Sequence, residues 1–313
     1  MRLTGQASLG MGVIVSALLV TASAAQGPGR WTSAAPMPEA RTEVAVSEVR
    51  GKVYVVGGFG GSRPLFEFDP DMNQWKVRAP LPLALHHAGA AAVGGKLYVV
   101  GGYAGRWSPV DGVFEYDPAA DRWRERARMP TARGALAVGV IDGKIHAIGG
   151  VGIGGRNTGA HEVYDPAGDR WTQVAPLPTP RDHLAVGVVA GRLYAIGGRV
   201  DGSYARNLQT NEGYDPSTDR WRRRAPLPTA RSGIAAAVLD GKIFVFGGEA
   251  PTGTFNQVEA YDPTTDAWTA WAPMPTARHG LGAAAVGGRI FVVSGGPSPG
   301  GSYSALNEVF TPR

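Results

Sequence analysis

Residues 231–273 read "RSGIAAAVLDGKIFVFGGEAPTGTFNQVEAYDPTTDAWTAWAP", and four runs within this segment can each form a β-strand. The first apolar run, "SGIAAAVL", is joined to the second, "KIFVFGG", through Asp-Gly, a pair that favours a two-residue hairpin turn. The third run, "QVEAYDP", ends in a turn signal, and the fourth, "DAWTAWAP", ends at a proline, which cannot donate to a ladder. The segment predicts a four-stranded antiparallel sheet, whose strands we call A to D.

The same signals recur in the same order along the chain. Tryptophans of the D runs stand at positions 31, 75, 123, 171, 221 and 268. Glycine doublets end the B runs at 57–58, 101–102, 149–150, 197–198, 247–248 and 295–296. An aromatic residue with Asp-Pro ends the C runs at 68, 116, 164, 214 and 261, and the last copy, Phe310-Thr311-Pro312, lacks the aspartate. This order, with a period of about 47 residues, predicts one supersecondary unit copied six times.

A sheet that is apolar on both faces must bury both of them against neighbours. Six such sheets arranged radially do so and leave only short edges, which predicts an all-β, six-bladed β-propeller. The chain opens on a D-type strand and stops after a C-type strand, so we expect residues 31–38 to complete the last blade and close the ring. We expect one propeller over 25–313, with blades at about 41–80, 85–128, 133–176, 181–226, 231–273 and 278–312.

The glycine doublet, the Tyr-Asp-Pro turn, the spaced tryptophan and the Pro-Met/Leu-Pro-x-x-Arg phrase together resemble the kelch repeat. WD40 repeats end in Trp-Asp, whereas here tryptophan follows aspartate, as in "DRW". The resemblance covers essentially the whole chain after the N-terminal segment. It implies a kelch propeller of the exported bacterial type, and it leaves the function open because this fold hosts enzymes, adaptors and secreted binding proteins.

The N-terminus and the composition narrow the function classes. A short basic start, an apolar run from 12 to 20 and Ala22-Ser23-Ala24 predict a signal peptide over 1–24 and therefore an exported, periplasmic or extracellular protein with no membrane span. The chain has no cysteine, which excludes thiolate catalysis and cysteine metal sites. The formal net charge is +5, but no nucleic-acid-binding motif accompanies it, so we expect no nucleic-acid partner.

Strand direction places the loops that join D to A, and those that join B to C, on one face of the propeller. The D–A loops carry the repeated phrase, for example "PLPTAR" at 226–231, and the B–C loops vary most in sequence. Variable loops on a rigid scaffold are common binding sites, so we predict the ligand site at the mouth of the axial channel on this face. The repeated arginines are Arg41, Arg133, Arg181, Arg231 and Arg278. They could bind acidic ligands at this mouth, as similar arginines do in kelch adaptors. They could instead serve blade packing, and we expect this second role for most copies.

The residues that follow each arginine position do not repeat, and four of the six histidines fall among them. Because a shared scaffold does not require such residues, we take them as candidate ligand contacts, with channel-lining polar residues as the alternative. In the B–C loops, Trp107 and Tyr204 could contact a sugar or a peptide, or could fold inward to hold their own loops. Together with Arg41, Arg133, Arg181 and Arg231, the candidate ligand-binding residues are Glu43, His86, His87, Trp107, Asp182, His183, Tyr204 and His279.

We therefore expect a non-catalytic protein that binds a protein, an acidic peptide or a glycan, with no cofactor. Copper oxidases on seven kelch-type blades need a cysteine-modified tyrosine, which this chain cannot form, and a His86/His183/His279 metal site has no supporting local spacing. The alternative is a sugar mutarotase resembling N-acetylneuraminate epimerase, with Glu249 as the acid or base. That resemblance also implies an arginine six residues further on, and Phe255 stands there instead.

Overall fold

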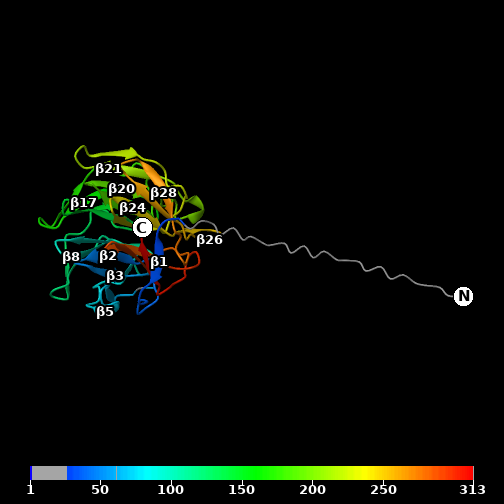
Figure 1. Ribbon diagram of the computed structural model, residues 1–313. Coiled ribbons are helices and arrows are strands. Elements are labelled where there is room, and N and C mark those ends of the chain that lie inside the picture. The colour runs from blue at the N-terminus through cyan, green and yellow to red at the C-terminus, as the bar shows by residue number, and fades with distance from the viewer. Residues whose placement is uncertain (2–26, 61, 313) are drawn as a thin grey trace.

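The computed structural model describes residues 1, 27–60 and 62–312, so the segment expected to be a signal peptide lies almost wholly outside the described residues. The predicted propeller is confirmed: six four-stranded antiparallel sheets follow one another along the chain (Figure 1). Blade 1 consists of β2 (Ala45–Val49), β3 (Lys52–Val56), β4 (Leu65–Asp69) and β5 (Gln74–Arg78). Blade 2 consists of β7 (Gly89–Val93), β8 (Lys96–Val100), β11 (Val113–Asp117) and β12 (Arg122–Glu125). Blade 3 consists of β14 (Ala137–Ile141), β15 (Lys144–Ile148), β17 (His161–Asp165) and β18 (Arg170–Gln173).

The second half of the chain repeats this plan. Blade 4 consists of β19 (Ala185–Val189), β20 (Arg192–Ile196), β21 (Asn211–Asp215) and β22 (Arg220–Arg223). Blade 5 consists of β23 (Ala235–Leu239), β24 (Lys242–Phe246), β27 (Val258–Asp262) and β28 (Ala267–Trp271). Blade 6 consists of β29 (Gly282–Val286), β30 (Arg289–Val293), β31 (Asn307–Thr311) and β1 (Arg30–Ser33).

The N-terminal strand closes the ring, as the sequence predicted. β1 pairs antiparallel with β31, so that Trp31 lies opposite Phe310, and Figure 1 shows the blue first strand beside the red C-terminal end. The strand covers 30–33, which is shorter than the expected 31–38. Regular pairing ends three residues before Pro36, whose missing N–H interrupts a ladder.

The repeated tryptophan joins each blade to the one before it. In every blade the indole N–H donates to a backbone carbonyl that follows the D strand of the preceding blade, for example from Trp221 to Ala175 O over 2.9 Å. In blades 2 to 5 the aspartate two residues before this tryptophan accepts the hydroxyl of the C-strand tyrosine and the N–H of the same alanine; in blade 4 these bonds run from Tyr214 (2.7 Å) and Ala175 (2.8 Å) to Asp219. The "DRW" and "YDP" signals therefore encode contacts between neighbouring blades.

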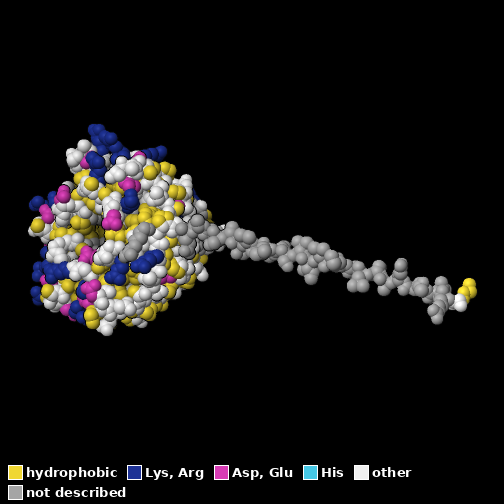
Figure 2. All heavy atoms as spheres, viewed as in Figure 1, with side chains coloured by type: hydrophobic (Ala, Val, Ile, Leu, Met, Phe, Trp, Pro, Cys, Tyr) yellow, Lys and Arg dark blue, Asp and Glu magenta, His cyan; other side chains and the backbone are white. Residues whose placement is uncertain are grey.

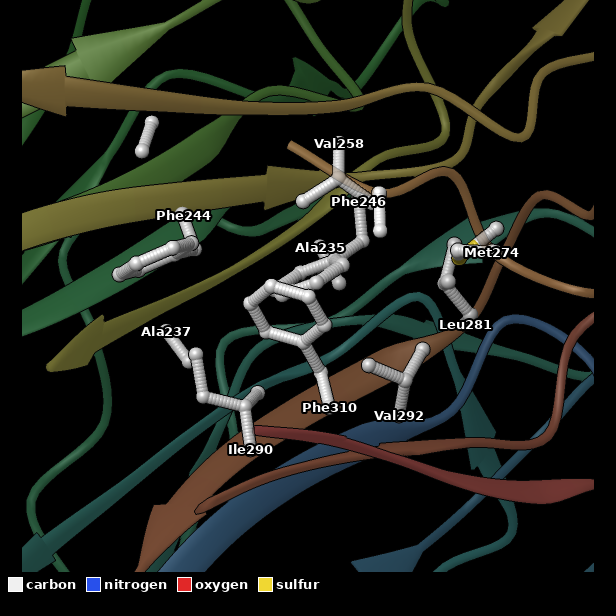
Figure 3. Packing of buried hydrophobic residues seen from close by; sticks show 12 residues of the cluster. Ala235, Ala237, Phe244, Phe246, Val258, Met274, Leu281, Ile290, Val292 and Phe310 are labelled. Atoms are coloured by element: carbon white, nitrogen blue, oxygen red, sulfur yellow. The ribbon is translucent and has the colours of Figure 1, made fainter. Parts of the chain in front are cut away.

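Apolar side chains fill the wedges between blades. Figure 3 shows the wedge between blades 5 and 6, where the rings of Phe244, Phe246 and Phe310 meet Ile290 and Val292. All five side chains are buried. Burying a large apolar side chain stabilises the folded state by about 1.5–3 kcal/mol, so each wedge is a substantial part of the stability.

Short pairings link the two kinds of loop on the predicted binding face. The D–A loop strand β6 (Leu85–His86) pairs with β9 (Tyr103–Ala104), which in turn pairs with β10 (Ser108–Pro109). Likewise β13 (Arg133–Gly134) pairs with β16 (Val151–Gly152), and β25 (Glu249–Ala250) forms a hairpin with β26 (Gly253–Thr254). The B–C loop of blade 4 contains a short 3-10 helix, η1 (Tyr204–Arg206). Because the D–A and B–C loops pair with each other, they share one face.

The basic residues beside the repeated tryptophans lie on the outer edge. Arg220, Arg222 and Arg223 are exposed on β22, and Figure 2 shows Lys and Arg side chains protruding in this region of the propeller, beside β21. Among the described residues no helix has the length and hydropathy needed to cross a membrane.

Candidate functional site

The repeated arginines are buried in the blades and do not line the channel mouth. Arg133, Arg181, Arg231 and Arg278 have no exposed surface, and Arg41 is 1% exposed. In blade 4 the guanidinium donates to Glu212 Oε2 (2.6 Å), to Gly197 O (2.7 Å) and to Thr179 O (2.9 Å). The bonds to the glutamate and to the threonine carbonyl recur for the other three paired arginines, whose glutamate partners are Glu162, Glu259 and Glu308. Burial fits the blade-packing role expected of most copies and removes Arg41, Arg133, Arg181 and Arg231 from the candidate ligand contacts.

The one copy that lacks the arginine confirms its packing role. In blade 2 Leu85 replaces the arginine, and Phe114 stands where blades 3 to 6 carry the glutamate; both are buried in one apolar cluster. Blade 1 is intermediate, because Arg41 lies over the ring of Phe66, 4.5 Å from its centroid, and pairs with Glu39 at the surface. Blades 3 to 6 therefore carry both the arginine and the glutamate, blade 2 carries neither, and in blade 1 Glu39 replaces the missing glutamate as the partner of Arg41.

A closed ring of backbone hydrogen bonds surrounds the propeller axis. In each blade the N–H of the residue two positions after the arginine donates to the carbonyl of its counterpart in the preceding blade, over 2.7–3.1 Å. All six residues have a left-handed backbone, with φ between 52° and 65°. We call these six residues the axial ring; they are Glu43, His87, Ala135, His183, Gly233 and Gly280.

The axial ring holds three titratable residues in a conformation that favours glycine. A left-handed backbone costs a residue with a side chain about 1–2 kcal/mol, a cost that Gly233 and Gly280 avoid. Glu43, His87 and His183 carry this cost although the ring closes equally well with glycine or alanine in the other blades. Strain of this kind clusters at functional sites, so these three side chains are the first to consider for function.

Two spaces meet at the axial ring. A narrow channel of about 90 Å³ lies on the axis and is lined by the ring residues of all six blades. Beside it, a cavity of about 250 Å³ opens on the loop face, and Glu43 and His87 line both spaces. We call this cavity the mouth pocket; its other lining residues are Thr42, Phe59, Trp107, Arg199, Gly202, Tyr204, Glu249, His279, Gly300 and Gly301.

One wall of the mouth pocket is aromatic. Trp107 packs against the rings of Phe59 (5.5 Å between centroids), Tyr103 (5.2 Å) and His86 (5.2 Å). It nevertheless remains 51% exposed. Trp107 therefore helps to hold its loop and still lines the pocket. The two roles considered for this residue, ligand contact and loop packing, are thus compatible.

Other residues that line the pocket are charged. His279 Nδ1 lies 3.3 Å from Glu43 Oε1 and 3.6 Å from Glu249 Oε2, and its Nε2 lies 3.1 Å from Ser298 O. Burial by itself lowers the pKa of His279, but Glu43 and Glu249 outweigh it and raise this pKa. Burial likewise acts to raise the pKa of Glu43, and the surrounding imidazoles reverse this and hold it well below its usual range. Glu43 and His279 therefore each favour the charged form of the other.

Arg199 organises the neighbouring buried groups. It donates through Nη1 to Glu249 Oε1 (2.6 Å), through Nε to Asp182 Oδ1 (3.2 Å) and through Nη2 to His183 Nε2 (2.9 Å). Its guanidinium also lies 5.5 Å from the ring centroid of Tyr204. The positive charge that faces the pocket therefore comes from a B–C loop residue and not from the repeated arginines.

The candidates from the D–A loops come together at the channel mouth. Glu43, His87 and His279 line the pocket. The ring of His86 packs edge-on against Trp107. Asp182 and His183 are hydrogen-bonded to each other, and Asp182 also pairs with Arg199. Sequence reasoning missed Arg199 and Phe59. Both directly follow a glycine doublet, as Glu249 does, and this position varies between blades in the same way as the two positions after the repeated arginine.

Two sets of side chains bring possible metal ligands within 4.8 Å of one another. The first set is Glu43, His87 and His183, and the second is Glu43, Glu249 and His279. The histidine triplet weighed from the sequence, His86/His183/His279, is not one of these sets, because His86 faces the carbonyl of Arg106 (3.1 Å) and His87 instead. Glu43 is common to both sets.

Comparisons with known proteins agree with the fold. The model of the KLHDC2/KLHL20/DRC7 Kelch-repeats domain matches residues 29–198 and 175–311. The solved structures with this fold include one titled "Structure of YjhT", which is similar with a TM-score of 0.76 over 87% of this chain and 95% of that chain, at 15% sequence identity. At this identity the likeness shows the fold alone. The curated proteins contain no significant match.

Proposed function

Because this chain belongs to the kelch-repeat family, a fold that serves binding proteins and enzymes alike, we propose its function from the site: the mouth pocket binds a single sugar residue of a glycan. The observation that carries the proposal is that the half-exposed indole of Trp107 lines the same cavity of about 250 Å³ as two largely buried carboxylates and an arginine. An indole face packs on the apolar face of a sugar ring, while charged groups exchange hydrogen bonds with its hydroxyls.

The charges of the pocket favour a sugar over an acidic peptide. The repeated arginines are paired inside the blades, and Arg199 already donates to two carboxylates. Glu43 and Glu249 also face the cavity. A carboxylate-rich ligand would be repelled by these two side chains, whereas hydroxyl groups can donate to them.

The N-terminal pattern of residues 1–24 supports the further proposal that the protein acts outside the cytoplasm, where glycans are abundant. N-terminal sequencing of the protein secreted or exported by an expressing bacterium tests this proposal. Cleavage after Ala24 is expected, and an intact Met1 on the exported protein would contradict it.

Binding of sugars and peptides to the folded chain distinguishes the two classes of ligand. We expect a glycan array to identify a preferred terminal sugar and titration calorimetry to show that Trp107→Ala weakens its binding at least about tenfold, the effect of losing an aromatic anchor. Ile153→Ala is the matched control, since Ile153 is 81% exposed on another B–C loop and does not line the pocket. Binding of acidic peptides without any sugar binding would overturn the proposal.

A second function, sugar mutarotation, is favoured by one specific observation. The arginine that the mutarotase resemblance implies is missing at Phe255, but Arg199 of the neighbouring blade reaches Glu249 at 2.6 Å. Glu249 therefore has a cationic partner, and with His279 beside it the pocket holds both a proton acceptor and a proton donor. NMR exchange between sugar anomers tests this function: acceleration that is lost in Glu249→Gln supports it, and no acceleration leaves a binding protein.

A further inference from the structure

Hydrogen-bond partners fix the protonation of the two adjacent histidines of blade 2. His86 Nε2 lies 3.1 Å from the carbonyl of Arg106, and because a carbonyl only accepts, this nitrogen carries a proton. In neutral His86, Nδ1 is then the acceptor, so His87 Nδ1, 2.6 Å away, donates to it. In neutral His87 this leaves Nε2 as an unprotonated lone pair.

That lone pair faces a carboxylate with no hydrogen between the two atoms. His87 Nε2 lies 3.3 Å from Glu43 Oε2, and both side chains are largely shielded from solvent. Two acceptors that face each other in a buried site are the arrangement expected around a cation.

His183 is prepared as a third ligand by its neighbour. Its Nδ1 donates to the carboxylate of Asp182, which also accepts from Asn157 Nδ2 (2.5 Å). The other nitrogen, Nε2, is therefore an acceptor, and it takes a hydrogen bond from Arg199 Nη2 (2.9 Å). A carboxylate behind a histidine fixes the tautomer and the ring orientation in the way usual for histidines that bind metals.

We infer that Glu43, His87 and His183 bind one divalent transition-metal ion on the propeller axis. Their ligand atoms lie within 4.8 Å of one another, and all three residues belong to the strained axial ring. Two imidazoles and one carboxylate suit Zn²⁺ and similar late first-row ions and leave coordination positions open. Because Glu43 and His87 also line the mouth pocket, those positions face the cavity.

Metal binding requires one rearrangement. Arg199 Nη2 donates to His183 Nε2 over 2.9 Å, and the ion would replace this hydrogen bond. Arg199 keeps its contacts with Glu249 (2.6 Å) and Asp182 (3.2 Å) through its other nitrogens. The second set of possible ligands is less suitable, because it holds two carboxylates and one imidazole and therefore one nitrogen ligand fewer than the first set.

Titration of the metal-free chain with Co²⁺, followed by visible absorption and calorimetry, tests the inference. We expect one Co²⁺ per chain, displaced by Zn²⁺, and a loss of affinity of at least about 100-fold in His87→Ala and in His183→Ala. Both variants should fold, because Ala135 occupies the equivalent ring position in blade 3 with φ 53°. Asp182→Asn should weaken binding by about 10- to 100-fold through loss of its support for His183.

A matched histidine variant controls for binding elsewhere. His161→Asn removes a buried histidine outside the site, and Asn211 and Asn307 occupy the same position in blades 4 and 6. It should bind Co²⁺ as the wild type does. The inference is overturned if neither Co²⁺ nor Zn²⁺ binds saturably at one ion per chain, or if His87→Ala and His183→Ala, shown to be folded by circular dichroism, bind as tightly as the wild type. Sugar binding by the metal-free protein is measured separately, so the two proposals can fail independently.

Discussion

Replacing one repeated arginine tests whether this residue type belongs to the scaffold. In Arg231→Leu the carboxylate of Glu259, which is 6% exposed, keeps only the hydroxyl of Thr229 (2.8 Å) as a side-chain donor. Breaking a buried ion pair from one side costs about 3–5 kcal/mol, which lowers the melting temperature by roughly 10 °C in a protein of this size. Urea unfolding at neutral pH measures the free energy of unfolding directly.

Blade 2 provides the compensating change. There a leucine and a phenylalanine, Leu85 and Phe114, replace the ion pair, so Arg231→Leu combined with Glu259→Phe should recover at least about half of the loss, less any cost of overpacking. Thr229→Val is the control, since it removes only one hydrogen bond and should cost about 1 kcal/mol. A single variant that loses less than about 1 kcal/mol, or a double variant no more stable than the single one, would refute the structural role of the arginine.

The remaining predictions concern ring closure, acid stability and the axial ring. Trp31→Ala removes the indole that donates to Ala272 O (2.9 Å) and packs against Phe310 (5.1 Å between ring centroids). It should lower the free energy of unfolding by about 3 kcal/mol. The control Val77→Ala, at an exposed position, should change this free energy by less than about 0.5 kcal/mol. Burial lowers the pKa of His161 from 6.5 to about 3, so below pH 6.5 the unfolded chain takes up a proton that the folded chain does not. The free energy of unfolding should therefore fall between pH 6.5 and pH 3, and urea unfolding should show a shallower fall in His161→Asn. An unchanged pH profile in that variant would contradict the assignment. His183→Gly should relieve the left-handed backbone strain and leave the protein at least as stable as His183→Ala; a less stable glycine variant would argue against strain at this position.

Most of the fold was predictable because its signals are local and repeated six times. The hairpin turns, the "YDP" and "DRW" phrases and the glycine doublets are local signals of contacts that recur from blade to blade; the indole bond, as from Trp221 to Ala175 O, occurs in all six blades. The ring closure followed from the strand types at the two ends of the chain. The exact length of β1 did not follow, because it depends on where Pro36 interrupts pairing with β31.

The site was predictable in position but not in its contacts. The register after each repeated arginine located Glu43, His87 and His183, because side chains that differ between equivalent blades are not required by the shared scaffold. Sequence reasoning could not show that the arginines are buried, since burial depends on the glutamate two residues before the C-strand aromatic. It also missed Arg199, because the contact from Arg199 to Glu249 joins two blades whose separation is set by packing.

Binding of a sugar beside Trp107 is the central functional claim, and one NMR measurement tests it most directly. In a ¹H–¹⁵N spectrum the indole N–H signal of Trp107 is identified by its absence in Trp107→Phe. Adding the sugar preferred on the glycan array should shift this signal, while the indole signals of the scaffold tryptophans, each bonded to a carbonyl of the preceding blade, should stay in place. A saturating sugar that leaves the Trp107 signal unmoved would contradict the proposed site.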